Sequence, residues 1–532
     1  MFSGKGERVM RRKPATALST IDLRRRRLLQ TLGIGGAAAG LGGLPWLTAP
    51  GALAGEPRHG GTLRVALPQA ATINPLRMSA GGAIAVVQQV AEYLVRVDEH
   101  LNLQPALATD WETPDEGRTW VFRLREGVKF NDGRPLEADD VVASFRRLVD
   151  PDVASVARSQ LDFLPPEGIS ADDRHTVRFE LSRPIGAFPY YTQIYNAVIL
   201  PRDHDGDLAS NPVGTGPFLL THYQAREEAV LERNPDYWDA PRPYLDRVRM
   251  AMYDGDQPQV LALRGNAADM MLFASYMNAR PLLDNEEINL LSARSTQHRQ
   301  LAMRCDQPPF EDVRLRRAVA LALGRESMVN NLIGGYGEPG NDHPVAPLYP
   351  DAADIDLARR EPDLERAQAL LAEAGVPNGF QIDLHIGRLA ELPQYGVLVE
   401  RMLNPIGIRV NLRVEPLNTY YEHWTKVNFG LTDWVGRAVP EQILAAAFRG
   451  GADWNAPHWR DDEFDAALSE LEAATDPARR RQLTATLAGK LHEEVPAAIT
   501  YFTQALRPVR RRVQGLRADN ANYLDLTRAW LA

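Results

Sequence analysis

Histidine and glutamate stand together at residues 492–495 in an order that begins like a zinc-peptidase helix. In that motif, two histidines four positions apart lie on one helix face and hold a zinc ion beside a glutamate base. His492-Glu493-Glu494-Val495 supplies the first histidine, but Pro496 stands where the second is needed. We therefore interpret this segment as a solvated helix end.

Acidic residues form two further patterns that could carry chemistry. Asp203, Asp205 and Asp207 alternate as the first ligands of a calcium loop do, but the glycine and the distal glutamate of such a loop are absent. We expect a polar surface loop there. The pairs Asp139-Asp140 and Asp461-Asp462 stand where predicted helices begin, and helix capping explains them better than acid–base catalysis.

The remaining candidates for catalysis or metal binding do not combine into a site. The sequence has neither a Walker-type phosphate loop nor a Gly-x-Ser-x-Gly elbow, and its single cysteine, Cys305, cannot form an internal disulfide. Four histidines without a tight ligand spacing are His343, His385, His423 and His458. We predict no catalytic residue, no resident metal and no cofactor, and hence a protein that is not an enzyme.

The elements that must position any site follow the order of an α/β protein. Residues 62–67 alternate with period two, whereas residues 83–95 repeat with helical spacing. A helix at 139–149 starts with acidic residues, which suit the positive end of a helix dipole. Its predicted buried stripe is Val141, Val142, Phe145 and Leu148. Further strands are expected at 121–124, 176–181, 230–233 and 247–253.

The α/β pattern restarts near Arg299. A strand at 299–305 leads into a helix at 313–323 and a glycine-rich turn at 334–337. The elements expected after it are helices at 362–374, 393–403, 461–474 and 477–494, and strands at 380–386, 408–414 and 498–502. Each portion of the chain is long enough to form a lobe, and two α/β lobes leave a cleft between them.

The first 54 residues differ from the rest in charge. They hold nine Lys and Arg but only two Asp and Glu, and Arg25-Arg26-x-Leu28-Leu29 begins an uncharged stretch like a twin-arginine export signal. Ala52-Leu53-Ala54 offers a cleavage site; the alternative, a membrane anchor, is disfavoured by the many glycines. The full chain has 60 Lys and Arg and 69 Asp and Glu, and without this segment 51 and 67 remain. The resulting net charge of −16 disfavours nucleic acid as a partner.

Several stretches of the mature chain together resemble the family five extracellular solute-binding proteins, the peptide, nickel and glutathione-type receptors of ABC importers. The first stretch is Ala91-Glu92-Tyr93-Leu94-Val95 with Asp98, Leu103-x-Pro105-Ala106-Leu107-Ala108, Trp111 and Phe122-x-Leu124-Arg125-x-Gly127-Val128-Lys129-Phe130-x-Asp132-Gly133. The others are Pro212-Val213-Gly214-Thr215-Gly216-Pro217-Phe218, Asn234-Pro235-x-Tyr237-Trp238 and Pro309-Phe310-x-Asp312-Val313-Arg314. The resemblance spans nearly the whole mature chain, although most of these residues suit turns and packing.

The resemblance implies an α/β, two-lobed periplasmic-binding-protein-like fold with a hinge and an extra subdomain on the first lobe. Its predicted parts are an export signal at 1–54, lobe one at 55–290 plus 505–532 with the subdomain at about 95–210, and lobe two at 291–504. It further implies a periplasmic monomer, exported by the twin-arginine route, that delivers a peptide-like or other small organic solute to an ABC permease. The alternatives are an exported hydrolase on the same scaffold and a metal-chelate receptor.

The segment Trp434-Val435-Gly436-Arg437 carries the most information about the ligand. In peptide-binding relatives an aspartate three residues after the corresponding tryptophan holds a peptide's α-ammonium; here Arg437 takes that place, and a guanidinium repels an ammonium but binds carboxylate or phosphate. We expect Arg437 to meet an anionic group, Trp434 and Trp454 to form apolar walls, and Asn455 to orient the ligand.

Structural alternatives remain open for these residues. Arg437 could instead pair with Asp433 or Asp453, and the tryptophans could belong to the core. Asn74, after the first strand, is a weaker candidate for ligand binding on positional resemblance alone. Its segment, Thr72-Ile73-Asn74-Pro75, could be a simple turn.

Overall fold

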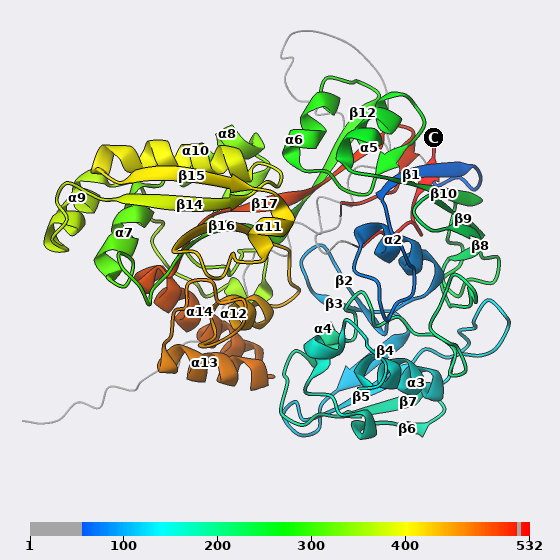
Figure 1. The fold of residues 1–532 in the computed structure, drawn as a ribbon. Coiled ribbons are helices and arrows are strands. Elements are labelled where there is room, and N and C mark those ends of the chain that lie inside the picture. The colour runs from blue at the N-terminus through cyan, green and yellow to red at the C-terminus, as the bar shows by residue number, and fades with distance from the viewer. Residues whose placement is uncertain (1–55, 519–522) are drawn as a thin grey trace, which may run out of the picture. The chain divides into compact units, whose positions relative to one another are not determined.

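An 11-stranded mixed β-sheet is the largest element of the fold, in a computed structural model that describes residues 56–518 and 523–532. The predicted export signal at 1–54 lies outside the described residues. The strand order is β15-β14-β16-β12-β17-β11-β1-β10-β9-β8, with β13 paired to β17 (Figure 1). The strands are β1 (Thr62–Pro68), β8 (Phe218–Gln224), β9 (Glu228–Arg233), β10 (Arg247–Tyr253), β11 (Met270–Met271), β12 (Ile288–Met303), β13 (Gly337–Pro339), β14 (Gln381–Gly387), β15 (Arg409–Glu415), β16 (Phe429–Trp434) and β17 (Ala497–Arg510).

Two long antiparallel strands, β12 and β17, hold the two ends of this sheet together. They pair from Ile288↔Arg510 to Ala302↔Ala497, with register shifts between Arg294 and His298 and at Arg299. The sequence predicted only the apolar end of each strand, 299–305 and 498–502, because the half of β12 before residue 295 is only partly buried and lacks an apolar alternation. The predicted lobe boundaries, 290/291 and 504/505, fall within these two strands.

Separate hydrophobic cores lie at the two ends of the large sheet. One core joins β1, β8, β9 and β10 to helix α2 (Gly81–Val90) and includes buried residues of the C-terminal segment up to Ala529. The other joins β12, β14, β15 and β16 to a set of four helices. These helices are α7 (Val313–Ala322), α8 (Arg325–Ile333), α9 (Leu364–Glu373) and α10 (Leu392–Leu403).

A four-stranded sheet, in the order β4-β5-β7-β6, forms a third core with helix α3 (Ala138–Val149). Its strands are β4 (Ala108–Glu112), β5 (Thr119–Leu124), β6 (Ile169–Asp173) and β7 (Thr176–Glu180). The predicted stripe of α3 is confirmed, since Val141, Val142, Phe145 and Leu148 are all buried in this core. The remaining elements of this part are β2 (Val95–Val97), β3 (Leu103–Pro105), α4 (Phe188–Tyr191), and the 3-10 turns at Arg158–Leu161 and Pro166–Gly168.

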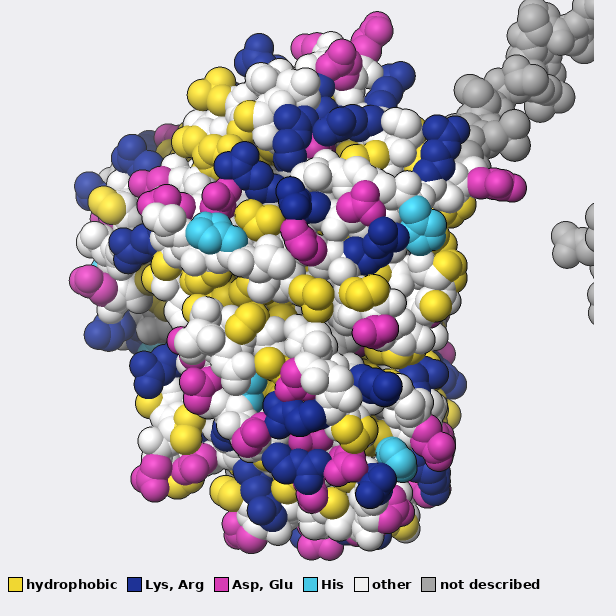
Figure 2. Space-filling view, turned by 90° about the vertical axis from the view of Figure 1, so that its right-hand side faces the viewer, with side chains coloured by type: hydrophobic (Ala, Val, Ile, Leu, Met, Phe, Trp, Pro, Cys, Tyr) yellow, Lys and Arg dark blue, Asp and Glu magenta, His cyan; other side chains and the backbone are white. Residues whose placement is uncertain are grey.

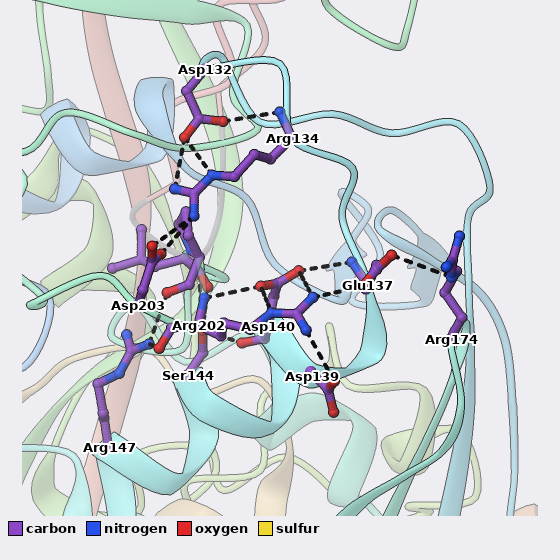
Figure 3. Close-up of polar contacts among 12 residues, drawn as sticks. Asp132, Arg134, Glu137, Asp139, Asp140, Ser144, Arg147, Arg174, Arg202 and Asp203 are labelled. Atoms are coloured by element: carbon purple, nitrogen blue, oxygen red, sulfur yellow. Dashed lines mark hydrogen bonds and ion pairs between the residues drawn. The ribbon is translucent and has the colours of Figure 1, made fainter.

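The start of α3 is fastened by a network of arginines and carboxylates (Figure 3). The Arg202 guanidinium donates to Glu137 at 2.7 Å, to Asp139 at 3.0 Å and to Asp140 at 3.1 Å. Asp140 also accepts the backbone N–H of Glu137 at 2.8 Å, which completes a capping box. Capping is thus confirmed for Asp140, whereas Asp139 pairs with Arg202.

The same close-up explains one of the alternating aspartates. Asp203 accepts two hydrogen bonds from Arg134, at 2.7 and 2.9 Å, while the Arg134 Nε donates to Asp132 at 2.7 Å (Figure 3). Asp203 is therefore an ion-pair partner, and none of the three alternating aspartates belongs to the group of possible metal ligands found among the described residues.

The end of helix α2 differs from the sequence prediction. The apolar periodicity predicts a helix over 83–95, but α2 ends at Val90 and Ala91 is extended, with φ −135° and ψ 151°. The extended chain brings the buried Glu92 between Tyr237 and Trp238, whose hydroxyl and indole N–H donate to it at 2.8 and 2.7 Å. These distant partners outweigh the local helix propensity.

Three helices near the C-terminus form a fourth core and complete the second half of the chain. They are α12 (Pro440–Phe448), α13 (Asp462–Ala473) and α14 (Pro477–Glu494). Asp461 caps α13 by accepting the N–H of Phe464 at 2.8 Å, as its position before a helix predicted. The smaller elements are α5 (Asp256–Arg264), α6 (Tyr276–Ala279), α11 (Leu417–Tyr421), β18 (Val513–Gln514), β19 (Trp530–Leu531) and the 3-10 turns at Arg280–Leu282, Pro350–Ala352 and Asn404–Ile406.

Glycines of the 212–218 segment allow a close approach of two chain segments. A Cβ atom at Gly214 would lie 2.1 Å from the carbonyl oxygen of Val90, and one at Gly216 would lie 2.4 Å from that of Gln89. Neither glycine has a positive φ. The sequence analysis was right that backbone geometry requires these glycines, but the reason is contact with the end of α2 rather than a left-handed turn.

The surface carries both signs of charge. On the face shown in Figure 2, basic and acidic side chains are interspersed and do not form a patch of one sign. Among the described residues, no helix combines the length and the apolar character needed to cross a bilayer.

Candidate functional site

Strand β16 lies between β14 and β12 in the large sheet and ends at Trp434, so that the segment 434–437 begins at its end. It pairs antiparallel with β12, so that Trp434 lies opposite His298, and it runs parallel to β14. The chain leaves β16 after Trp434 and enters helix α12 at Pro440. The sequence analysis did not predict β16, because its Gly, Thr and Asp residues hide a strand that is nevertheless almost wholly buried.

Trp434 lies in a group of aromatic rings and is 5% exposed. Its ring centroid is 5.9 Å from that of Trp454, 6.0 Å from that of Trp424 and 6.5 Å from that of His298, to which it lies nearly parallel. Trp454 by contrast is 51% exposed. Trp434 is thus part of the fourth core, whereas Trp454 presents much of its ring outside it.

Arg437 is half-buried and has no carboxylate partner among the described residues. Its backbone is fixed by Thr296, whose hydroxyl accepts from the Arg437 N–H and donates to its carbonyl, both at 2.9 Å. Burial lowers the pKa of Arg437, and only the phenol groups of Tyr349, Tyr195 and Tyr191 oppose this shift. The guanidinium still carries its full charge at neutral pH.

The carboxylates that could have neutralised Arg437 do not bind it, and two of them bind other side chains. Asp433 accepts from the Tyr421 hydroxyl at 2.7 Å, and Glu441 binds Arg480 with both oxygens at 2.9 Å. Asp453 makes no ion pair within residues 56–518 and 523–532. The alternative of an Arg437 pair with Asp433 or Asp453 is therefore not observed.

Other polar atoms near Arg437 also lack partners. The buried Nε1 of Trp434, the Nε2 of His298 and the hydroxyl of Tyr349 make no hydrogen bond of standard geometry with the described residues. Burial lowers the pKa of His298 to about 3, so its imidazole is neutral at pH 7. Buried polar groups normally have partners, and this concentration of unpartnered polar atoms marks the region as suited to a polar ligand group.

A cavity of about 310 Å³ adjoins this segment. Asp433 and Val435 line it from β16 and its continuation, Gln297 and Arg299 from β12, and Phe273 from the loop before α6. Val435 and Phe273 are 48% and 43% exposed, although both are large and apolar. Exposed apolar side chains inside a cavity are typical of a surface that a ligand covers.

Not every charge in the cavity is available to a ligand. Arg299 donates to Glu391 at 2.7 Å, and Glu391 also accepts from the hydroxyl of Tyr501 at 3.1 Å. Both members of this pair are nearly buried, with 10% and 3% of their side chains exposed. The pair is compensated within the chain and so serves to hold β12 to the start of α10.

The two asparagines of the predicted site lie in different settings. The Asn455 amide donates to the carbonyl oxygens of Arg449 at 3.0 Å and Trp459 at 2.8 Å, which leaves its buried Oδ1 without a partner. The Asn74 Oδ1 accepts from the N–H of Leu76 at 2.9 Å, as in an Asx turn. The structure thus brings Trp434 and Trp454 together, but none of the described contacts of Asn74 is with these two residues or with Arg437.

The two halves of the chain also touch away from the long strands. The N–H of Gly186 donates to the carbonyl oxygen of Glu472 at 2.7 Å. A Cβ atom at Gly186 would lie 1.8 Å from the carbonyl oxygen of Ala474. Leu101 is buried in the fourth core beside residues of α12 to α14. The subdomain therefore contacts the helices that follow Arg437.

Comparison with known proteins identifies the family. The model of the bacterial extracellular solute-binding proteins, family 5, matches residues 102–456, more than half of the chain. The protein belongs to this family. The resemblance seen in the sequence is confirmed, and with it the assignment as a solute-binding protein of the kind that serves ABC importers. Members of family 5 are binding proteins, so the alternative of an exported hydrolase is not favoured.

Similar proteins cover most of the chain. The di/tripeptide-binding protein 2 of Pseudomonas aeruginosa is 28% identical over 469 residues, or 80% of this chain and 86% of the relative. The heme-binding protein A of Haemophilus influenzae is 25% identical over 464 residues, or 80% of this chain and 84% of the relative. The structure of HbpA2 from Haemophilus parasuis superposes with a TM-score of 0.77 at 22% identity and covers 89% of this chain and all of that one. The two-lobed α/β fold is thereby confirmed.

Several residues of the candidate site could not be predicted from the sequence. Val435, Phe273 and the tyrosines around Arg437 come from distant segments, and no local pattern joins them. Only Val435 could have been suspected from the sequence, because this apolar residue stands between Trp434 and Arg437.

Proposed function

We propose that this protein binds a small organic solute that carries an anionic group and an apolar portion. Arg437 holds the anion, while Val435, Phe273 and Trp454 cover the apolar portion. The observation that carries the proposal is the half-buried guanidinium without a carboxylate partner. A charge in such a place is costly unless something neutralises it, and a ligand carboxylate or phosphate would do so through paired hydrogen bonds.

The surroundings of Arg437 support an anion rather than a cation. Tyr349 and Trp434 can only add hydrogen-bond donors toward a ligand anion, because the Trp434 indole has no acceptor and the phenol of Tyr349 carries a proton. Burial raises the pKa of Tyr349, so the phenol stays protonated at neutral pH. A peptide bound with its α-ammonium at this position would face the positive charge of Arg437, which repels it.

Asn455 enters the proposal through the loop that it holds. Because its amide hydrogens bind the carbonyl oxygens of Arg449 and Trp459, the residue fixes the segment that carries Trp454. Only its Oδ1 remains to accept a hydrogen bond from a ligand. Asn74 has its Nδ2 left for a ligand, since its Oδ1 closes the turn at Leu76.

The rest of the transport cycle is proposed from the family. The lobes, at 55–290 plus 505–532 and at 291–504, would close about β12 and β17 on the solute, and the closed monomer would deliver it to an ABC permease. We further propose export by the twin-arginine route into the periplasm, the compartment of family 5 binding proteins. No nucleic acid takes part in this cycle.

A thermal-shift screen of charge-matched compounds tests the proposal. Pairs such as a carboxylic acid and its amide, or a phosphate ester and its parent alcohol, differ in the anionic group alone. We expect the anionic member of an active pair to raise the melting temperature. At 100 times its Kd, it should raise the free energy of unfolding by about 2.7 kcal/mol. The proposal is wrong if neutral or cationic members stabilise the protein as well as the anionic ones do.

A further inference from the structure

Two histidines and a glutamate converge at the edge of the large sheet, away from the cavity. His385 lies on β14 and Glu415 at the end of the neighbouring parallel strand β15, where the register pairs Gly387 with Glu415. His423 follows the short helix α11, which turns the chain back toward the strand ends. The sequence analysis found no tight set among the histidines, because 38 residues separate His385 from His423 and only the strand pairing brings them together.

The geometry of the three side chains is compact. Glu415 faces His385 Nδ1 with one oxygen at 3.0 Å and His423 Nε2 with the other at 2.8 Å. The two imidazole rings are nearly perpendicular, with centroids 5.8 Å apart. The three candidate ligand atoms all lie within 4.8 Å of one another, and no other such group of three occurs in residues 56–518 and 523–532.

Glu415 differs from most carboxylates of this arginine-rich chain. Its described ion pairs are with the two histidines alone, while the neighbouring Arg413 pairs with Asp383 at 3.0 Å. With neutral imidazoles the group therefore carries one negative charge that no lysine or arginine compensates. Such a group attracts a cation, and its two nitrogens favour a transition metal over calcium or magnesium.

We propose that His385, Glu415 and His423 bind one divalent first-row transition metal ion, of the class of Zn²⁺, Ni²⁺ or Cu²⁺. A tetrahedral ion with bonds of about 2.0–2.2 Å needs ligand atoms about 3.4 Å apart, which small side-chain rotations supply here. Each neutral imidazole can carry its proton on the ring nitrogen that faces away from the ion, so binding requires no net loss of protons from neutral rings.

The access and the role of the ion follow from the same contacts. The side chains of His385, Glu415 and His423 are 28%, 23% and 33% exposed, so that solvent reaches the group and can fill the remaining coordination position. None of the three lines the 310 Å³ cavity. The ion would clamp both ends of α11, whose Tyr421 hydroxyl donates to Asp433 in the cavity wall, and would bind without solute.

Calorimetric titration of the full mature chain, produced without a polyhistidine tag, tests the site with Zn²⁺, Ni²⁺ and Cu²⁺. We expect one ion per chain. His423→Gln, which keeps a hydrogen-bond donor toward Glu415, and His385→Gln should each lower the affinity at least 10-fold, as loss of one ligand does. The matched control, His222→Gln, replaces an exposed histidine of β8 and should bind like the wild type.

A spectroscopic measurement keeps the test decisive if a variant does not fold. The electron paramagnetic resonance spectrum of Cu²⁺ bound to the wild type should show coupling to two imidazole nitrogens. The proposal is overturned if the wild type binds none of the three ions, if the glutamine variants bind them unchanged, or if the copper spectrum shows no imidazole nitrogen.

Discussion

Arg202 and Arg437 have opposite surroundings. Arg202 meets three carboxylates of the segment 137–140, and hydrogen bonds to Glu137 and Asp140 raise its pKa (Figure 3). Arg437 meets tyrosines and no carboxylate, and burial lowers its pKa. The first arginine holds the chain together, and the second has bonding capacity left for something outside the chain.

The most buried arginine of this kind, one neutralised by carboxylates of the same chain, is Arg325. Arg325 binds both oxygens of Asp342 at 2.6 Å, with 2% and 0% of their side chains exposed, and Arg360 adds a bond to Asp342 at 2.7 Å. Its charges are compensated where they are buried. If the comparison is right, removing a partner should affect stability here, whereas at Arg437 it should affect only binding.

The largest expected effect is that of Asp342→Ala. The change leaves Arg325 buried without its carboxylate, and breaking such a pair costs about 3–5 kcal/mol. Urea unfolding at pH 7, monitored by circular dichroism, measures the loss. A loss below 1 kcal/mol would show that burial and pairing do not decide the role of an arginine in this protein.

Acidification should weaken the same pair. Burial alone would raise the pKa of Asp342, but the charges of Arg325 and Arg360 outweigh it and leave the pKa below its ordinary value. A depressed carboxyl pKa contributes stability above the unfolded value of about 3.9, and this contribution is lost as pH falls through the folded value. The free energy of unfolding should therefore fall below about pH 4, and this fall should be smaller in Asp342→Asn.

A smaller loss is expected from Arg202→Met. The Arg202 side chain is 43% exposed, so solvent screens its ion pairs, and we expect a loss of about 1 kcal/mol. The exposed pair of Arg366 with Glu373 provides a control. Arg366→Met should lower the free energy of unfolding by less than about 0.5 kcal/mol, as is usual for a single surface ion pair. Equal losses for both variants would mean that the three-carboxylate network adds nothing to a single pair.

The smallest effect on stability should be that of Arg437→Met. Because no carboxylate is left unpaired, the variant should unfold within about 0.5 kcal/mol of the wild type or be more stable. The same urea series measures it. A loss above 2 kcal/mol would assign Arg437 to the architecture, together with Arg202.

Local patterns predicted the elements whose burial is periodic. The stripe of α3 and the cap at Asp461 follow from side-chain spacing and helix-end chemistry alone. Strand β16 and the partly buried half of β12 were missed because pairing with distant strands, not apolar alternation, decides their conformation. For the same reason α2 was predicted too long, since Glu92 is held by Tyr237 and Trp238 from far along the chain.

The candidate site shows a similar division. The sequence predicted Arg437 and the two tryptophans as ligand-binding residues, and the structure places the rings of Trp434 and Trp454 next to each other. It could not predict that Glu441 is occupied by Arg480, or that the phenols of Tyr349, Tyr195 and Tyr191 act on the pKa of Arg437. These facts depend on the docking of separate segments, which leaves no mark in any one of them.

The solute affinity of Arg437→Met is the most direct test of the account. Calorimetry with an anionic solute found in the charge-matched screen would compare this variant with the wild type and with Arg366→Met. We expect Arg437→Met to weaken binding by about 1.5–5 kcal/mol while Arg366→Met leaves it unchanged. Equal affinity for all three proteins would contradict the assignment of Arg437 to the ligand.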